Sequence, residues 1–174
     1  MKLVHSLQIL VRGAFVLACL IAAGSNVRAA PADDVRQADT ALATGDVFVA
    51  MSLLRRAADQ NDALAQARLG DLLHAAEFDA EALVLYRKSA EQGEAAGEFG
   101  LGRMYADGAG VPRDPAKALE WYRKAESKNH PQTLDALARA YRTGSLGLAR
   151  DLDRANALDE RVRTLYAAQK AAAK

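Results

Sequence analysis

Cysteine is almost absent from this chain. The single one, Cys19, lies in an apolar stretch near the N-terminus. A chain that has lost this N-terminal stretch would contain no cysteine. It could then form no disulfide, perform no thiol chemistry and bind no metal through thiolates.

Histidine and the motifs of common active sites are also scarce. Beyond residue 29 the only histidines are His74 and His130, and two histidines without cysteine do not match common zinc spacings. Neither Gly-x-Ser-x-Gly nor Ser-x-x-Lys occurs in the sequence. The glycines between residues 100 and 110 lie within and after a predicted helix, so they do not form a phosphate-binding loop. We therefore predict a protein that is not an enzyme and that has no catalytic residues, no metal and no cofactor.

The chain has no long hydrophobic run. Its apolar stretch Gly13–Gly24 is shorter than the roughly 20 residues that a membrane helix needs. Lys2 and Arg12 give it a basic start, and small residues follow it. This order is typical of a secretory signal peptide. We predict that residues 1–29 are a cleaved signal peptide and that the protein is periplasmic or secreted.

Two alternatives compete with a cleaved signal. The same apolar stretch would also serve as an uncleaved membrane anchor. Val16-Leu17-Ala18-Cys19 faintly resembles a bacterial lipobox, but the apolar run continues past the cysteine, so we disfavour lipidation at Cys19. Cleavage would leave residues 30–174 as one helical repeat domain that is not inserted in a membrane.

Neither sign of charge dominates. The chain has 23 Lys+Arg and 22 Asp+Glu, for a formal net charge of +1. Removal of the predicted signal peptide, which holds basic residues and no acid, would leave a slightly acidic chain. This balance does not suggest a general nucleic-acid partner or an anionic membrane as a partner.

The stretch from Ala95 to Asn129 has the pattern of a helical hairpin. Apolar residues recur at helical spacing as far as Tyr105, and a glycine-rich turn at 107–110 would end this first helix. Asp114-Pro115 then supplies an N-cap and a first helical residue for a second helix. Glycines inside the first helix predict close approach to a neighbouring helix.

Similar patterns recur along the chain. Leu69-Gly70 precedes Leu101-Gly102 by 32 residues, and Leu137-Ala138 follows it by 36. We expect an all-α fold of about four antiparallel helix pairs. This number is sufficient for stability, since such repeats need about three copies. The expected pairs are about 34–61, 62–93, 95–129 and 130–170. Asp62 and Asp79 are the predicted caps of the two helices in the second pair. Aromatic residues recur at equivalent positions, which predicts core positions for Tyr86, Tyr105, Trp121, Tyr122 and Tyr141.

The third hairpin carries the most specific motif. Its sequence LGRMYADGAGVPRDPAKALEWYRKA, residues 101–125, resembles the Sel-one-like repeat, a subclass of the tetratricopeptide-like helical repeats. The matching positions are Leu101-Gly102, Tyr105, Gly108, Gly110-Val111, Asp114, Lys117-Ala118, Trp121-Tyr122 and Lys124-Ala125. The other hairpins match less fully, with Leu158 in place of Trp121 in the last one. The resemblance implies a right-handed α-solenoid that binds other proteins.

Candidate binding residues follow from that resemblance, because the first helix of each pair lines the concave side of such a stack. The position after Leu-Gly is polar and lies off the apolar face, and its neighbours one turn away extend it into a stripe. The predicted binding residues are Asp71, His74, Phe99, Arg103, Asp135, Arg139 and Arg142. Arginine pairs well with carboxylates, so an acidic segment of a protein or peptide is the expected partner.

We predict an exported adaptor or scaffold that binds a protein or peptide through its concave face. One alternative is recognition of glycan or peptidoglycan, which an aromatic-lined groove would favour. Another is a hydrolase that acts on the cell wall, which clustered carboxylates in a cleft would favour. Neither feature stands out in the sequence.

Overall fold

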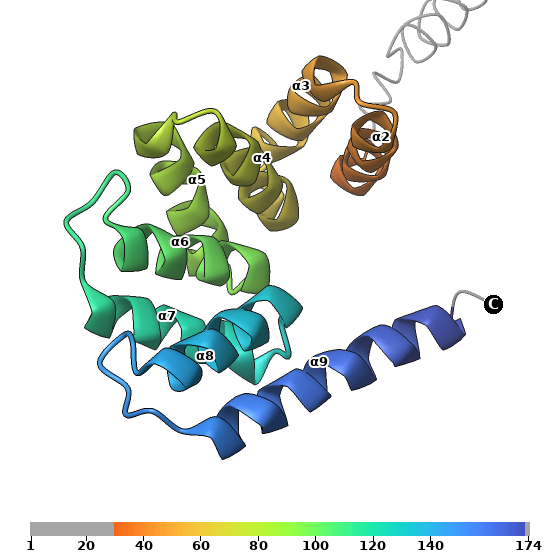
Figure 1. Cartoon of the computed structure of the whole chain (residues 1–174). Helices are drawn as coiled ribbons and strands as arrows, with labels where there is room; N and C mark the ends of the chain where they lie inside the picture. The colour runs from red at the N-terminus through yellow and green to blue at the C-terminus, as the bar shows by residue number, and fades with distance from the viewer. Residues whose placement is uncertain (1–29, 173–174) are drawn as a thin grey trace, which may run out of the picture.

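A computed structural model describes residues 30–172, and the predicted signal peptide, residues 1–29, lies outside the described residues. Residues 30–172 form eight α-helices and no strand. The helices are α2 (Pro31–Ala43), α3 (Val47–Ala58), α4 (Ala63–Ala75), α5 (Asp79–Glu91), α6 (Ala95–Asp107), α7 (Pro115–Ser127), α8 (Pro131–Thr143) and α9 (Leu152–Ala172). The predicted all-α fold is confirmed (Figure 1). Within the described part of the chain, no helix combines the length and hydrophobicity needed to cross a membrane.

Consecutive helices form hairpins that stack into a curved solenoid (Figure 1). The hairpins are α2–α3, α4–α5, α6–α7 and α8–α9, and each is held by extensive contact between its two helices. Neighbouring hairpins pack through α3 with α4 and α5 with α6, and the first helices α4 and α6 also contact each other. The contact between α7 and α8 is much smaller, so the last hairpin is joined less tightly to the rest.

Left-handed residues recur where one hairpin passes to the next. They are Asn61, Gly93 and Asn129, with φ values of 64°, 79° and 56°. After each of them, the next amide returns to a carbonyl oxygen near the end of the preceding helix; Glu94 N, for example, donates to Ser89 O at 3.2 Å. This closure satisfies carbonyls that the end of a helix leaves free. The same turn therefore ends each of the first three hairpins.

Aspartate residues cap several of the helices. The predicted caps Asp62 and Asp114 are confirmed, since their carboxylates accept from Ala65 N at 2.8 Å and Lys117 N at 3.0 Å. The prediction is wrong for Asp79, which is the first residue of α5 and follows the N-cap Phe78. The carboxylate of Asp79 contacts a histidine of α4 instead of capping its own helix.

Two of the five predicted core aromatics are buried. Tyr86 is 0% exposed and Tyr122 is 4% exposed. The prediction is wrong for the remaining three, which are only partly buried: Trp121, Tyr105 and Tyr141. A basic side chain covers each of these rings, as the Lys124 Nζ does at 3.7 Å from the ring centroid of Trp121. The three rings lie at the margins of the core, where a cation can rest on an aromatic face and stay in contact with water.

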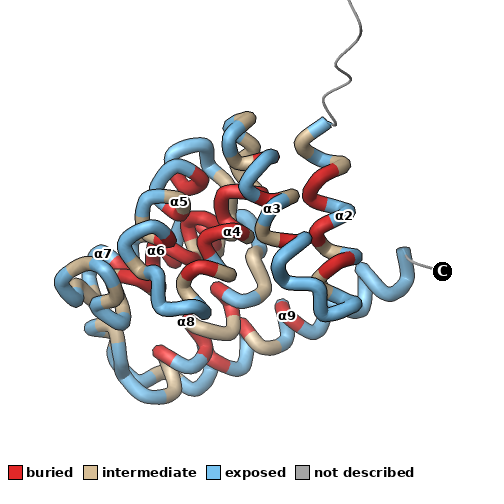
Figure 2. Tube along the Cα trace, turned by 90° about the horizontal axis from the view of Figure 1, so that it is seen from above, coloured by how far each residue is buried: buried red, intermediate tan, exposed pale blue. Residues whose placement is uncertain are grey.

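The core is divided between the two halves of the solenoid. The buried residues of one apolar cluster come from α2, α3, α4, α5 and α6. Those of a second cluster come from α7, α8 and α9. In Figure 2 buried segments run through the centre of the stack, whereas the end of α9 is exposed. The last buried residue of α9 is Val162, so the final part of this helix extends beyond the core of its own hairpin.

Candidate functional site

A cleft of about 740 Å³ opens on the concave side of the solenoid. Residues from the first helix of every hairpin line it, together with residues from the far end of α9. Its apolar and aromatic lining includes Leu42, Leu64, Leu72, Phe99 and Tyr166. No single hairpin could form this cleft, because its walls come from the whole stack.

The structure divides the predicted binding residues into two groups. Four of them line the concave cleft: Asp71, His74, Phe99 and Arg103. The other three are Asp135, Arg139 and Arg142 of α8, and they do not line it. The cleft meets α8 only at its start, near His130, and these three residues lie further along the helix.

The charged groups on α4 and α6 are joined through Tyr86. The Tyr86 hydroxyl donates to Asp71 Oδ1 at 2.7 Å, and Arg103 Nη2 lies 2.7 Å from the Tyr86 oxygen and 3.1 Å from Asp71 Oδ1. Burial raises the pKa of Tyr86 well above its usual range, and the nearby Asp71 carboxylate raises it further. The phenol therefore stays protonated and links the two helices. Asp71 and Arg103 are consequently engaged within the protein.

Most of the other charges of the cleft are paired as well; Glu94 forms no ion pair, and its carboxylate accepts from Ala96 N at the start of α6. His74 Nδ1 lies 2.6 Å from Asp79 Oδ1, and Arg68 pairs with Asp39. A carboxylate that holds one ring nitrogen fixes the orientation of the imidazole. The described residues that line the cleft include no serine, threonine or cysteine that such a histidine could activate. In residues 30–172 there is also no cluster of three or more His, Cys, Asp or Glu that could hold a metal ion.

Aromatic rings pack together around Phe99 of the cleft, and the Arg103 guanidinium lies 5.7 Å from the Phe99 ring centroid. Phe99 stacks on Tyr122 with ring centroids 5.8 Å apart, and its centroid lies 5.2 Å from that of His130. His130 Nδ1 lies 2.9 Å from Thr133 Oγ1. Burial lowers the pKa of His130, and nearby carboxylates oppose this effect only in part. The imidazole is therefore neutral at pH 7, and Phe99 is held between two rings.

The arginines of α8 differ from each other. Arg142 forms an ion pair with Asp159 of α9, whereas Arg139 is exposed and has no ion-pair partner among the described residues. The sequence placed both in one solvated stripe with Arg103. Two of these three arginines, Arg103 and Arg142, instead connect neighbouring helices.

Sequence reasoning missed the contribution of α9 to the cleft. Tyr166 and Gln169 line it, and Tyr166 is 50% exposed. The expected last pair ends at about residue 170, and none of the predicted binding residues belongs to its second helix. The length of the last helix, 21 residues against 13 for α8, is the feature that carries these side chains back to the concave side.

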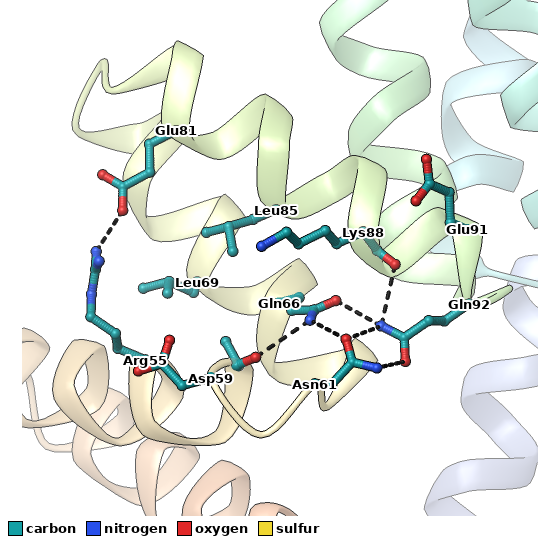
Figure 3. A pocket seen from close by; sticks show the side chains of 11 residues that line it. Arg55, Asp59, Asn61, Gln66, Leu69, Glu81, Leu85, Lys88, Glu91 and Gln92 are labelled. Carbon is teal, nitrogen blue, oxygen red and sulfur yellow. Dashed lines mark hydrogen bonds and ion pairs between the residues drawn. The ribbon is translucent and has the colours of Figure 1, made fainter.

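A second groove, of about 530 Å³, is lined by residues of α3, α4 and α5 (Figure 3). Arg55 pairs with Glu81 across it at 2.8 Å. Deeper in the groove, Gln92 Nε2 donates to Gln66 Oε1 at 2.8 Å, and Gln66 Nε2 donates to Asn61 Oδ1 at 3.1 Å. These amides satisfy one another and fasten the second hairpin to the first. The concave cleft is larger and is the better candidate site.

The family of the chain follows from these repeats. The model of the Sel1 repeat matches residues 44–62, 79–94, 95–130 and 133–158, which together make up more than half of the chain. The chain therefore belongs to the Sel1 repeat family. Repeats of this family form helical scaffolds that are typical of protein–protein interaction and are generally not enzymatic.

Solved structures show the same architecture. The crystal structure of a Sel1 repeat protein from Oxalobacter formigenes has a TM-score of 0.59 and 26% identity, over 65% of this chain and 47% of that one. The structure of c5321, a protective antigen present in uropathogenic Escherichia coli strains that displays an SLR fold, has a TM-score of 0.57 and 35% identity. That similarity covers 64% of this chain and 24% of c5321. The similarity thus spans less than half of either protein. A comparison with curated proteins found no match.

Proposed function

We propose that this protein is an exported scaffold that binds a segment of another protein in its concave cleft. The observation that carries the proposal is that all four hairpins and the end of α9 contribute to the walls of that cleft. A volume of about 740 Å³ falls in the range of about 300–1,000 Å³ in which ligand sites are found. Several side chains of a partner segment would fit in it.

The chemistry of the cleft suggests how a segment would be held. Leu64, Leu72 and the edge of Phe99 offer apolar surface, and Gln132 and Gln169 offer amide groups at the rim. Apart from Glu94, the charged residues of the cleft already have ionic partners within the chain, so they would orient a ligand rather than attract it over a distance. We therefore expect the cleft to bind apolar side chains of the partner segment.

Export is a separate part of the proposal. It is supported by the basic, apolar and small-residue order of residues 1–29. A chain without cysteine after that segment suits an oxidising compartment, because no thiol would be exposed to unwanted pairing.

Recognition of glycan or peptidoglycan is the second candidate. Tyr166 is the observation that favours it, because a half-exposed aromatic ring in a cleft can stack on a sugar face. Phe99 is less suited to stacking, since Tyr122 and His130 already pack against its ring.

A pair of matched variants tests the cleft. Ala75 is exposed and lines it, whereas Ala116 is exposed on α7 and does not line it. Partner capture from a native periplasmic extract should be lost with Ala75→Trp and retained with Ala116→Trp. Capture that is equal in the two variants would show that the partner does not use the concave cleft.

A further inference from the structure

The second groove has an apolar part beside its amide network. It is formed by Ala58 of α3, Leu69 of α4 and Leu85 of α5. Leu85 packs against the first apolar cluster but is only partly buried, and it lines the groove. In Figure 3 the side chain of Lys88, one turn further along α5, extends toward Leu85. Lys88 is exposed and forms no ion pair with any residue from 30 to 172, so its charge is free to meet a ligand.

The next hairpin has an aromatic ring at the position of Leu85. Trp121 lies 36 residues after Leu85, and Lys124 lies 36 residues after Lys88. Trp121 packs against the same apolar cluster as Leu85, and Lys124 Nζ lies 3.7 Å from the centroid of its ring. The third hairpin therefore carries an indole covered by a cation where the second hairpin carries a leucine and an unpaired cation.

Contacts next to these two positions show that their surroundings are alike. In the second hairpin Gln92 Nε2 donates to Gln66 Oε1 at 2.8 Å, and in the third Lys128 Nζ lies 2.6 Å from Glu98 Oε1. Glu98 follows Gln66 by 32 residues and Lys128 follows Gln92 by 36, so the two contacts join equivalent positions. The stacking is also alike, because α3 packs extensively on α4, as α5 does on α6. The repeat spacing thus relates two hairpins of the same construction.

The fourth hairpin provides an independent comparison. Leu158 stands there in place of the tryptophan, and it lines a hollow of about 280 Å³ together with Arg154 and Arg161. Each of these three residues follows a residue of the second groove by 73 positions; those residues are Glu81, Leu85 and Lys88. Among the last three hairpins, a hollow therefore lies beside each leucine that replaces the tryptophan.

The two hollows differ in their charged groups. Arg161 is engaged, since it donates to Asn129 Oδ1 at 2.7 Å and to Glu126 Oε1 at 3.2 Å. The second groove is the larger hollow and retains the unpaired cation of Lys88. Two exposed carboxylates also line it without an ion pair to any described residue, those of Asp59 and Glu91. It is therefore the better candidate for a ligand with both an apolar body and polar edges.

We propose that the second groove is a docking site for a tryptophan side chain of a partner protein. The indole would lie on Leu85, in the place that Trp121 fills in the next hairpin. Its negative face would attract the ammonium group of Lys88, and its N–H would donate to the carboxylate of Asp59 or Glu91. None of the residues that line this groove lines the concave cleft, so the inference does not depend on the proposed function.

A small indole probe tests the site directly. N-acetyl-tryptophanamide is titrated into the protein, whose leucine methyl groups are labelled with carbon-13 and followed by NMR. The methyl signals of Leu85, assigned from their loss in Leu85→Trp, should shift and saturate at roughly millimolar probe, since one side chain provides few contacts. N-acetyl-leucinamide should neither shift these signals nor displace the tryptophan probe. Signals that stay in place with both probes, or displacement by the leucine probe, would overturn the proposal.

Variants in the groove separate a specific site from adsorption to the surface. Binding in them is followed through the methyl signals of Leu69, which also lines the groove. Leu85→Trp supplies an indole from within and should abolish probe binding. Lys88→Ala should weaken binding about two- to fivefold, which corresponds to an exposed cation–π contact. The matched control is Arg87→Ala, because Arg87 is an exposed basic neighbour on α5 that does not line the groove. Binding that survives Leu85→Trp, or that weakens equally in Lys88→Ala and Arg87→Ala, would contradict the proposal.

The converse variant is Trp121→Leu. It should open a hollow in the third hairpin, so that the probe binds a second time and shifts the methyl signals that the substitution introduces. Circular dichroism shows whether this variant is folded. A folded Trp121→Leu protein that still binds only one probe would contradict the equivalence of the two hairpins and overturn the proposal. The variants of Leu85 and Lys88 decide the question if Trp121→Leu does not fold.

A second copy of this chain is the other occupant to exclude, because it would offer the 83% exposed ring of Phe48. Dimers of the free protein in analytical ultracentrifugation that are lost in Leu85→Trp would assign the groove to a second copy and overturn the proposal of a separate partner. A monomer at all concentrations would support it. Ala75→Trp, which obstructs the concave cleft, should leave probe binding unchanged. A failure of this site can therefore be distinguished from a failure of the cleft.

Discussion

Gly100 of α6 lies directly against the ring of Tyr86 of α5: a Cβ atom at this glycine would be 2.2 Å from the ring. Gly70 of α4 also approaches this ring, since a Cβ atom there would be 2.9 Å from it. The tyrosine therefore fills the space between α4 and α6, and its hydroxyl reaches the charges that join them. This single side chain connects the packing of the second and third hairpins to the polar surface of the concave side.

Replacement of Gly100 by alanine should destabilise the protein. The added methyl group would collide with Tyr86, and overpacking of this kind costs about 1–3 kcal/mol. Alanine gains about 1 kcal/mol in helix propensity, so a net loss of up to about 2 kcal/mol is expected in urea unfolding. The comparison variant is Ala136→Gly at the equivalent position of α8, which loses about 1 kcal/mol of helix propensity together with the contacts of one partly buried methyl group. A Gly100→Ala protein as stable as the wild type would mean that Tyr86 has room to move.

Removal of the two tyrosine hydroxyls should have unequal effects. Tyr86→Phe removes a hydrogen-bonded hydroxyl and should cost about 1–2 kcal/mol of unfolding free energy. Tyr122→Phe should cost less than about 0.5 kcal/mol, because that hydroxyl has no hydrogen-bond partner among residues 30–172. Chemical denaturation of the two variants without ligand makes the comparison. Equal costs would contradict the assignment of a structural role to the Tyr86 network alone.

His130 should make the fold sensitive to mild acid. Its pKa in the folded protein is lowered from 6.5 because the ring is buried, so the unfolded chain binds a proton more readily. The contribution of His130 to stability is therefore complete above about pH 6.5 and decreases as the pH falls from there toward the folded pKa. The melting temperature should fall between pH 7.5 and pH 5.5. In His130→Gln, part of that decrease should disappear, and an identical pH profile in the two proteins would exclude His130 as its source.

The repeat architecture was predictable because its signals are local. Helix caps at Asp62 and Asp114, the glycine turns and the 32- and 36-residue spacing each depend on a few neighbouring residues. The close approach predicted from glycines inside a helix is also confirmed, at Gly100. These features suffice to define hairpins and their order.

The pairing of charges was not predictable from the same patterns. Arg103 and Asp71 occupy equivalent positions in consecutive repeats, and their contact depends on how far apart two stacked helices lie. Helical spacing shows only which face a residue occupies. It does not show whether an arginine on that face meets solvent, as Arg139 does, or another helix, as Arg142 does.

The margins of the core were equally hard to predict. Trp121 and Tyr122 are neighbours on one apolar face, but only Tyr122 is buried. Their exposure is decided by the curvature of the stack and by basic side chains such as Lys124 that cover an outer ring. The return of Tyr166 to the concave cleft likewise depends on the direction of α9, which no local motif records.

The prediction of export concerns the N-terminal segment. If residues 1–29 are a signal peptide, mass spectrometry of protein recovered from the native cell should find a mature N-terminus at or near Ala30. A lipid-modified Cys19 would instead appear as a chain that begins at that cysteine with an added mass. Recovery of intact chains that begin at Met1 would reject cleavage and favour an uncleaved anchor.

Alanine substitutions of the three arginines in the predicted stripe should lower the unfolding free energy to different extents. Arg103→Ala should lower the unfolding free energy by about 1–3 kcal/mol, because it leaves the buried oxygen of Tyr86 and the Asp71 carboxylate without their charged donor. Arg142→Ala breaks a partly exposed ion pair with Asp159 and should cost no more than about 1 kcal/mol. Arg139→Ala should change stability by less than about 0.5 kcal/mol, since its side chain is exposed and has no ion-pair partner in the described part of the chain. Thermal melts of the three single variants would measure this order, and a loss at Arg139 equal to that at Arg103 would mean that Arg139 also holds neighbouring helices together.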